Sequence, residues 1–76
     1  MSGRLPTLKA HDLIRVLKKL GFNEVRQRGA HICFKHPDDG RFTLVPYHNS
    51  EDISRGLLRQ ILREINISPN EFLKLL

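Results

Sequence analysis

The sequence contains a single cysteine, Cys33, so the chain cannot form an internal disulfide. It also lacks a run of about 18 apolar residues and an apolar signal segment at its N-terminus, which favours a cytoplasmic protein with no membrane partner. Cys33 does not belong to a Cys-x-x-Cys pair, so we expect a small packing residue rather than a reactive thiol.

Common catalytic and cofactor motifs are missing as well. The chain has no Walker phosphate loop, no Gly-x-Gly-x-x-Gly and no His-Glu-x-x-His. Its histidines, at positions 11, 31, 36 and 48, do not have the spacing of zinc ligands. His31 and His36 would point to opposite faces of one strand. We therefore expect no metal site and no cofactor.

The composition is that of a small basic domain. With 76 residues, the chain is long enough for one domain, residues 1–76, and too short for two. Thirteen lysines and arginines against eight acidic residues give a formal net charge of +5. Such a surface attracts phosphate backbones and acidic partner proteins, although solubility explains the charge equally well.

Hydrophobic periodicity predicts three helices and three strands. Leu13, Leu17 and Leu20 recur at helical spacing and Gly21 ends that helix, whereas alternating runs between turn residues are typical of strands. The Ser-Pro-Asn-Glu run at 68–71 is a strong helix start. The predicted order is a helix over 9–20, strands over 23–28, 31–36 and 41–46, a helix over 54–65 and a short helix over 68–75.

The connection between the first two strands fixes their expected pairing. Gly29 and Ala30 suit a two-residue type II′ turn, because glycine comes first. The expected cross-strand pairs are Arg28 with His31, Arg26 with Cys33 and Glu24 with Lys35. These charged side chains share one face, and the apolar side chains share the other.

The elements together predict an α+β fold of the order α-β-β-β-α with a short additional C-terminal helix. The helices should cover one face of a three-stranded antiparallel sheet and leave the other face in water. We expect Val25, Ile32 and Phe34 to face the core. A four-residue loop and a five-residue bulged loop after the second strand would place Phe42 and Leu44 on opposite faces, and we favour the loop that points both toward the core. His31 should stand on the open face.

An exposed histidine beside arginines is poorly explained by packing and suits RNA cleavage. The reaction needs a base for the 2′-hydroxyl proton, an acid for the leaving oxygen and positive charge near the phosphate. Histidine can fill either proton-transfer role. His31 is therefore the candidate catalytic residue, and the candidate RNA-binding residues are Arg26, Arg28, Lys35 and His48. His48 serves as a second proton-transfer group or as a loop cap, and His36 is expected to be structural or solvated.

Four segments together resemble the HicA-type mRNA interferase toxins. They are Leu13 to Phe22, Arg28-Gly29-Ala30-His31, Val45-Pro46-Tyr47-His48 and Gly56 to Arg63. The resemblance implies a double-stranded-RNA-binding-like fold and a toxin of a type II toxin–antitoxin system. It also implies metal-independent endoribonuclease cleavage of mRNA and neutralisation by a HicB-type antitoxin. The family's catalytic histidine follows a glycine and a small residue, which places it at His31. That small residue is often serine, whereas this chain has Ala30.

Two alternatives remain open at the level of sequence. One is a non-catalytic module that binds double-stranded RNA, although Arg55 and Arg59 stand alone where typical binders carry a dense lysine run. The other is a partner-binding subunit whose activity is weakened by Ala30.

Overall fold

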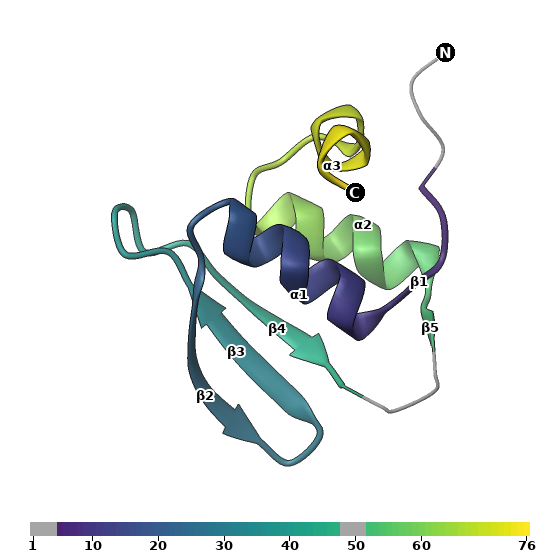
Figure 1. Ribbon diagram of the computed structural model, residues 1–76. Helices are drawn as coiled ribbons and strands as arrows, with labels where there is room; N and C mark the ends of the chain where they lie inside the picture. Colours follow the sequence, from purple (N-terminus) through teal and green to yellow (C-terminus); the bar gives the residue numbers. More distant parts are fainter. Residues whose placement is uncertain (1–4, 48–51) are drawn as a thin grey trace.

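The computed structural model describes residues 5–47 and 52–76 of the chain. Strands β2, β3 and β4 form a three-stranded antiparallel sheet in that spatial order, and α1 and α2 lie on one side of it (Figure 1). The elements are β1 (Leu8–Lys9), α1 (Ala10–Lys19), β2 (Asn23–Arg28), β3 (His31–Lys35), β4 (Phe42–Pro46), β5 (Asp52–Ile53), α2 (Arg55–Glu64) and α3 (Pro69–Leu75). The predicted α+β fold and its short C-terminal helix are confirmed.

The hydrophobic core lies between the helices and the inner face of the sheet. Leu13 and Leu17 of α1, Leu58 of α2 and Phe34 of β3 are fully buried, and α3 adds Phe72. Each large apolar side chain buried in this way contributes about 1.5–3 kcal/mol relative to leaving it in water. This burial fixes the helices against one face and leaves the other face free for function.

A second, two-stranded sheet was not predicted. β1 pairs antiparallel with β5, with Leu8 opposite Ile53 and Lys9 opposite Asp52. The side chains of Lys9 and Asp52 form an ion pair at 2.9 Å, while Leu8 and Ile53 are buried. Strands of two residues are too short to show a hydrophobic period, so the pattern of the sequence does not reveal them.

The register between β2 and β3 confirms two of the three expected pairs. Arg28 lies opposite His31 and Arg26 lies opposite Cys33. Lys35, however, pairs with Asn23 rather than with Glu24, because the register shifts between Glu24 and Arg26. Such a bulge places one extra residue on a strand and displaces everything beyond it.

The prediction that Val25 faces the core is also wrong. Val25 lies within this bulge and is 51% exposed. All six residues of β2 are exposed, because β2 is the edge strand of the sheet and the helices pack against β4 at the other edge (Figure 1). Strand β2 therefore contributes charge to the molecular surface and little to the core.

The expectation that Phe42 and Leu44 face the core is wrong for a different reason. The backbone N–H of His36 donates to Arg41 at 2.8 Å, so the loop over 37–40 has four residues. This loop length places Phe42 opposite Lys35 and Leu44 opposite Cys33. Phe42 and Leu44 are consequently 47% and 44% exposed, and Thr43 and Val45 are buried in their place.

Candidate functional site: the open face of the sheet

The face of the three-stranded sheet that points away from the helices, here called the open face, presents three rows of side chains. The rows run across β2, β3 and β4 as Arg28–His31–Pro46, Arg26–Cys33–Leu44 and Asn23–Lys35–Phe42. Neighbouring strands are about 4.8 Å apart, and successive rows follow at about 6.7 Å. Cationic side chains thus lie along β2, and apolar ones lie along β4.

His31 stands at one end of this face, as predicted. It is the first residue of β3 and is exposed to solvent. Gly29 has a φ of 56°, the positive value that a two-residue type II′ turn requires at its first central residue, and His31 follows this turn. The turn sets Arg28 directly opposite His31, so an imidazole and a guanidinium share one accessible row. This pair is the chemically most capable arrangement on the open face.

A hollow of about 380 Å³ lies in the middle of the open face. Arg26 and Arg28 line one side of it, Phe42 and Leu44 line the other, and His31 borders it as well. Cys33 also lines it, and at 2% exposed it is buried between Arg26 and Leu44, which agrees with the expected packing role. The hollow therefore has a cationic wall, an apolar wall and a small thiol between them.

A second hollow, of about 260 Å³, begins at the same histidine. It is lined by β4 residues and by Leu57, Gln60 and Glu64 of α2, together with His31. The buried hydroxyl of Thr43 donates to the Glu64 carboxylate at 2.7 Å and ties α2 to β4 at this point. His31, Phe42 and Leu44 line both hollows, which therefore adjoin along these three residues.

The other predicted RNA-binding residues are placed less uniformly. Arg26 and Arg28 lie in neighbouring rows, but Lys35 is four residues from His31 along β3, about 13 Å at the usual strand rise. His48 lies outside the residues that the structure describes. Sequence reasoning missed Phe42 and Leu44 as part of this face. The signal that could have identified them is the length of the loop between His36 and Arg41, which has four residues.

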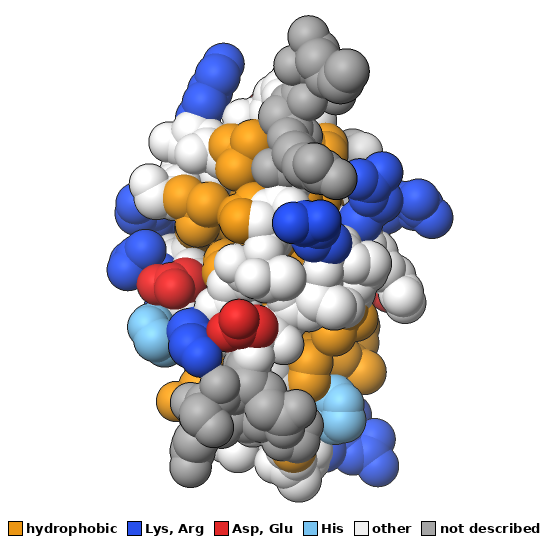
Figure 2. Space-filling model, turned by 90° about the vertical axis from the view of Figure 1, so that its right-hand side faces the viewer, with side chains coloured by type: hydrophobic (Ala, Val, Ile, Leu, Met, Phe, Trp, Pro, Cys, Tyr) orange, Lys and Arg blue, Asp and Glu red, His pale blue; other side chains and the backbone are white. Residues whose placement is uncertain are grey.

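Basic side chains also occur away from the open face. Figure 2 shows one side of the molecule, where lysine and arginine side chains project along both flanks and also lie near the middle, with acidic side chains among them. Arg55, Arg59 and Arg63 are exposed on α2. The cationic character of the protein is therefore broader than the open face, and what distinguishes that face is a histidine paired across two strands with an arginine.

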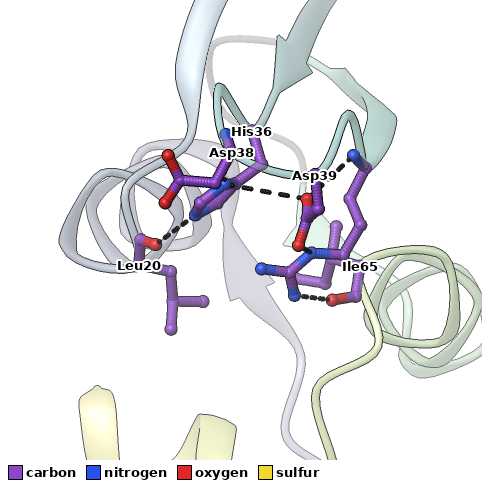
Figure 3. A network of polar contacts seen from close by, with 6 residues as sticks. Leu20, His36, Asp38, Asp39 and Ile65 are labelled. Carbon is purple, nitrogen blue, oxygen red and sulfur yellow. Dashed lines mark hydrogen bonds and ion pairs between the residues drawn. The ribbon is translucent and has the colours of Figure 1, made fainter.

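His36 has a structural place, as expected. Its Nε2 lies 3.1 Å from the carbonyl oxygen of Leu20 at the end of α1 (Figure 3). Its ring meets that of Phe22 edge-on, with centroids 5.0 Å apart. Its side chain is only 11% exposed. His36 therefore holds the β3–β4 loop against α1 and is remote from solvent chemistry.

Asp39 and Arg41 complete this structural cluster. The backbone N–H and the guanidinium of Arg41 both bond to the Asp39 carboxylate, and they hold the pKa of Asp39 below its usual value. The guanidinium also donates to the carbonyl of Ile65 at the end of α2. The perturbed titrating group thus belongs to the scaffold.

Two further observations concern cofactors and membranes. Within residues 5–47 and 52–76, no three histidine, cysteine or acidic side chains gather as a set that could hold a metal ion. None of the helices in the described part of the chain has the length and apolar character needed to cross a membrane.

Comparison with known proteins identifies one similarity. A protein-family model described as "HicA toxin of bacterial toxin-antitoxin" matches residues 10–67, a stretch that includes α1, the whole three-stranded sheet and α2. A search among curated proteins finds no match. The matched stretch covers most of the chain and includes the open face with His31.

Proposed function

Because the chain belongs to the HicA toxin family of bacterial toxin–antitoxin systems, we propose that it acts as an endoribonuclease that cleaves mRNA, with His31 as its key residue. The single observation that carries the proposal is the accessible row in which Arg28 lies directly opposite His31. An imidazole can move a proton, and a guanidinium beside it can stabilise a phosphate that gains charge.

The chemistry at this row follows from the needs of the reaction. The 2′-oxygen of a ribose loses its proton and bonds to the adjacent phosphorus, while the bond to the 5′-oxygen breaks and that oxygen gains a proton. His31 performs one of these two proton transfers, and His48 is the proposed candidate for the other. Arg28 stabilises the crowded, doubly negative phosphorane. All of these roles are filled by side chains, so we propose a reaction that is independent of metal.

The RNA would be held by the remaining cations of the open face. Arg26 lies one row from His31 on β2, and Lys35 extends the charge to the far end of β3. Contacts of this kind neutralise phosphates and release counterions, so binding should weaken as salt increases.

We further propose that the toxin is neutralised by a HicB-type antitoxin that covers the open face. Phe42 and Leu44 are large apolar side chains that are nearly half exposed, on the same face as the arginines of β2. A protein surface with apolar and acidic residues would match both groups. An antitoxin bound to this face would keep RNA away from His31 without any change in the toxin's fold.

The decisive experiment compares His31→Ala with a matched histidine control. His11 on α1 is also exposed, with 69% of its side chain in solvent, and it lies outside the open face. We expect wild type and His11→Ala to arrest growth of a bacterial host and to degrade its mRNA, whereas folded His31→Ala does neither. Purified wild type should keep its activity when a chelator is added. Equal toxicity from folded His31→Ala and wild type would remove His31 from the mechanism.

One alternative role follows from the residue before the histidine. Ala30 lies in the turn, and its carbonyl oxygen accepts from the backbone N–H of Tyr47 at 2.6 Å, so its position beside His31 is fixed. A hydroxyl at this position is what the chain lacks. A large gain in RNA cleavage by Ala30→Ser would favour a partner-binding subunit with weakened activity, and an unchanged rate would count against it.

A further inference from the structure

We infer that the hollow in the open face binds one unpaired nucleotide, with phosphate on the wall of Arg26 and Arg28 and the base on the wall of Phe42 and Leu44. The inference rests on the proposed function, since it specifies which form of RNA the same face takes. The inference gives Phe42 and Leu44 a part in recognising the substrate, which is separate from the proton transfer proposed for His31.

The cross-section of the hollow matches the parts of a nucleotide. In its central row, Arg26 on β2, Cys33 on β3 and Leu44 on β4 lie side by side. At the usual strand spacing, the cationic and apolar walls stand about 10 Å apart. A nucleotide likewise carries its charge on one side of the ribose and its flat apolar base on the other. Cys33 is small and buried, which leaves space for the ribose between the walls.

Phe42 and Leu44 are available for such a contact. Both lie outside the buried cluster that forms the hydrophobic core, and both are nearly half exposed. An aromatic ring that lies on an open sheet face next to arginines is a typical platform for base stacking, because every base has a π-face. Phe42 also borders the second hollow.

Only an unpaired nucleotide can use both walls at once. In duplex RNA the bases are stacked on one another, and a protein meets phosphates, 2′-hydroxyls and base edges but no base faces. A duplex could contact the arginine wall and would leave Phe42 and Leu44 in water. The neighbouring positive charge favours a polyanion over a purely apolar occupant.

The test measures binding separately from cleavage. In a His31→Ala background, chosen to prevent the proposed cleavage, fluorescence anisotropy at fixed salt compares a short labelled single-stranded RNA with a hairpin of the same composition. The two strands of the hairpin are joined by a non-nucleotide linker, so it contains no unpaired nucleotide. We expect Phe42→Ala to weaken single-strand binding by roughly 5- to 150-fold, the range for loss of one stacked base, and to leave hairpin binding unchanged. Phe42→Tyr should restore the affinity. Leu76→Ala removes a side chain of similar exposure, 45%, at the C-terminus and should have no effect.

The outcomes separate this inference from the proposed function. Single-strand binding that depends on Phe42 supports the inference even if wild type cleaves nothing. If wild type cleaves RNA through His31 but folded Phe42→Ala binds single strands as tightly as its parent, the inference is overturned and the apolar wall is left to the protein partner. Equal affinity for hairpin and single strand in the parent protein overturns it too.

Discussion

His36 and Arg41 stand at the two ends of one four-residue loop, and each bonds the final carbonyl of a different helix. His36 Nε2 lies 3.1 Å from the oxygen of Leu20 at the end of α1, and the Arg41 guanidinium donates to Ile65 at the end of α2. The last carbonyls of a helix lack partners within the helix, so such side chains satisfy them. The loop that fixes the register of β4 is therefore also the clamp between the sheet and both helices.

Replacement of His36 by phenylalanine should destabilise the fold. The Nδ1 of His36 accepts from the backbone N–H of Asp38 at 3.2 Å, which assigns the ring hydrogen to Nε2 and makes it the donor to Leu20. His36→Phe keeps a ring beside Phe22 but removes both bonds, and we expect a loss of about 1–3 kcal/mol in the free energy of unfolding. Urea denaturation measures this loss. His11→Phe, at an exposed position, is the control, and equal stability of both variants would contradict a clamp at His36.

Asp39 should give the protein a specific sensitivity to acid. Its bonds to Arg41 lower its pKa in the folded state, so the unfolded chain binds more protons as the pH falls. The stabilisation that Asp39 provides is complete above its unfolded pKa of 3.8 and is lost as the pH falls through the lower, folded value. The effect is modest, since the carboxylate is exposed to solvent and salt.

Thermal denaturation between pH 6 and about pH 2, through and below the usual carboxyl range, tests this expectation. We expect Asp39→Asn to be less stable than wild type near neutral pH and the difference to shrink in acid. Asp38→Asn, the neighbouring loop position, is the matched control. A difference that stays constant with pH would show that the Asp39 charge does not stabilise the fold.

The Thr43–Glu64 bond should hold α2 at the edge of the second hollow. Thr43 is 1% exposed, and its hydroxyl donates to the Glu64 carboxylate at 2.7 Å. Thr43→Val keeps the shape of the side chain and removes the donor, and we expect a cost of about 1 kcal/mol in unfolding free energy. A double-mutant cycle with Glu64→Ala, which removes the acceptor, isolates the pair. Strictly additive losses would mean that the bond contributes nothing to stability.

Local sequence patterns were sufficient for the three helices, for the three-stranded sheet and for the position of His31, because each depends on short-range rules. Gly29 before Ala30 sets a two-residue turn, and that turn alone places Arg28 opposite His31. The bulge at Val25 is different, since nothing in the alternation of β2 marks an extra residue there. A bulge is a compromise between two paired strands and is therefore not visible in one of them.

The position of Phe42 illustrates a second limit of sequence reasoning. A phenylalanine and a leucine at alternate positions favour a buried face by hydrophobicity, yet the hydrogen bonds that close the loop from His36 to Arg41 decide otherwise. Hydrophobicity favours burial of both side chains in the core, whereas the strand register places them on the open face. Large apolar side chains that remain exposed to water often mark a binding site.

Replacing Arg28 by alanine should affect kcat, whereas replacing Lys35 by alanine should affect KM. Arg28 shares a row with His31, whereas Lys35 lies about 13 Å further along β3. A cation that contacts the reacting phosphate stabilises the transition state, so we expect Arg28→Ala to lower kcat by about 10²–10³-fold with a small change in KM. A cation that only holds the RNA backbone contributes to binding, so Lys35→Ala should raise KM, leave kcat unchanged and reduce the salt dependence of binding by about 0.7 in the logarithmic slope. Steady-state cleavage of a labelled RNA over a series of salt concentrations measures both quantities. If Lys35→Ala instead lowered kcat as strongly as Arg28→Ala, the reacting phosphate would have to lie between the two rows, and the centre of the reaction would move from the His31 end of the open face toward Cys33.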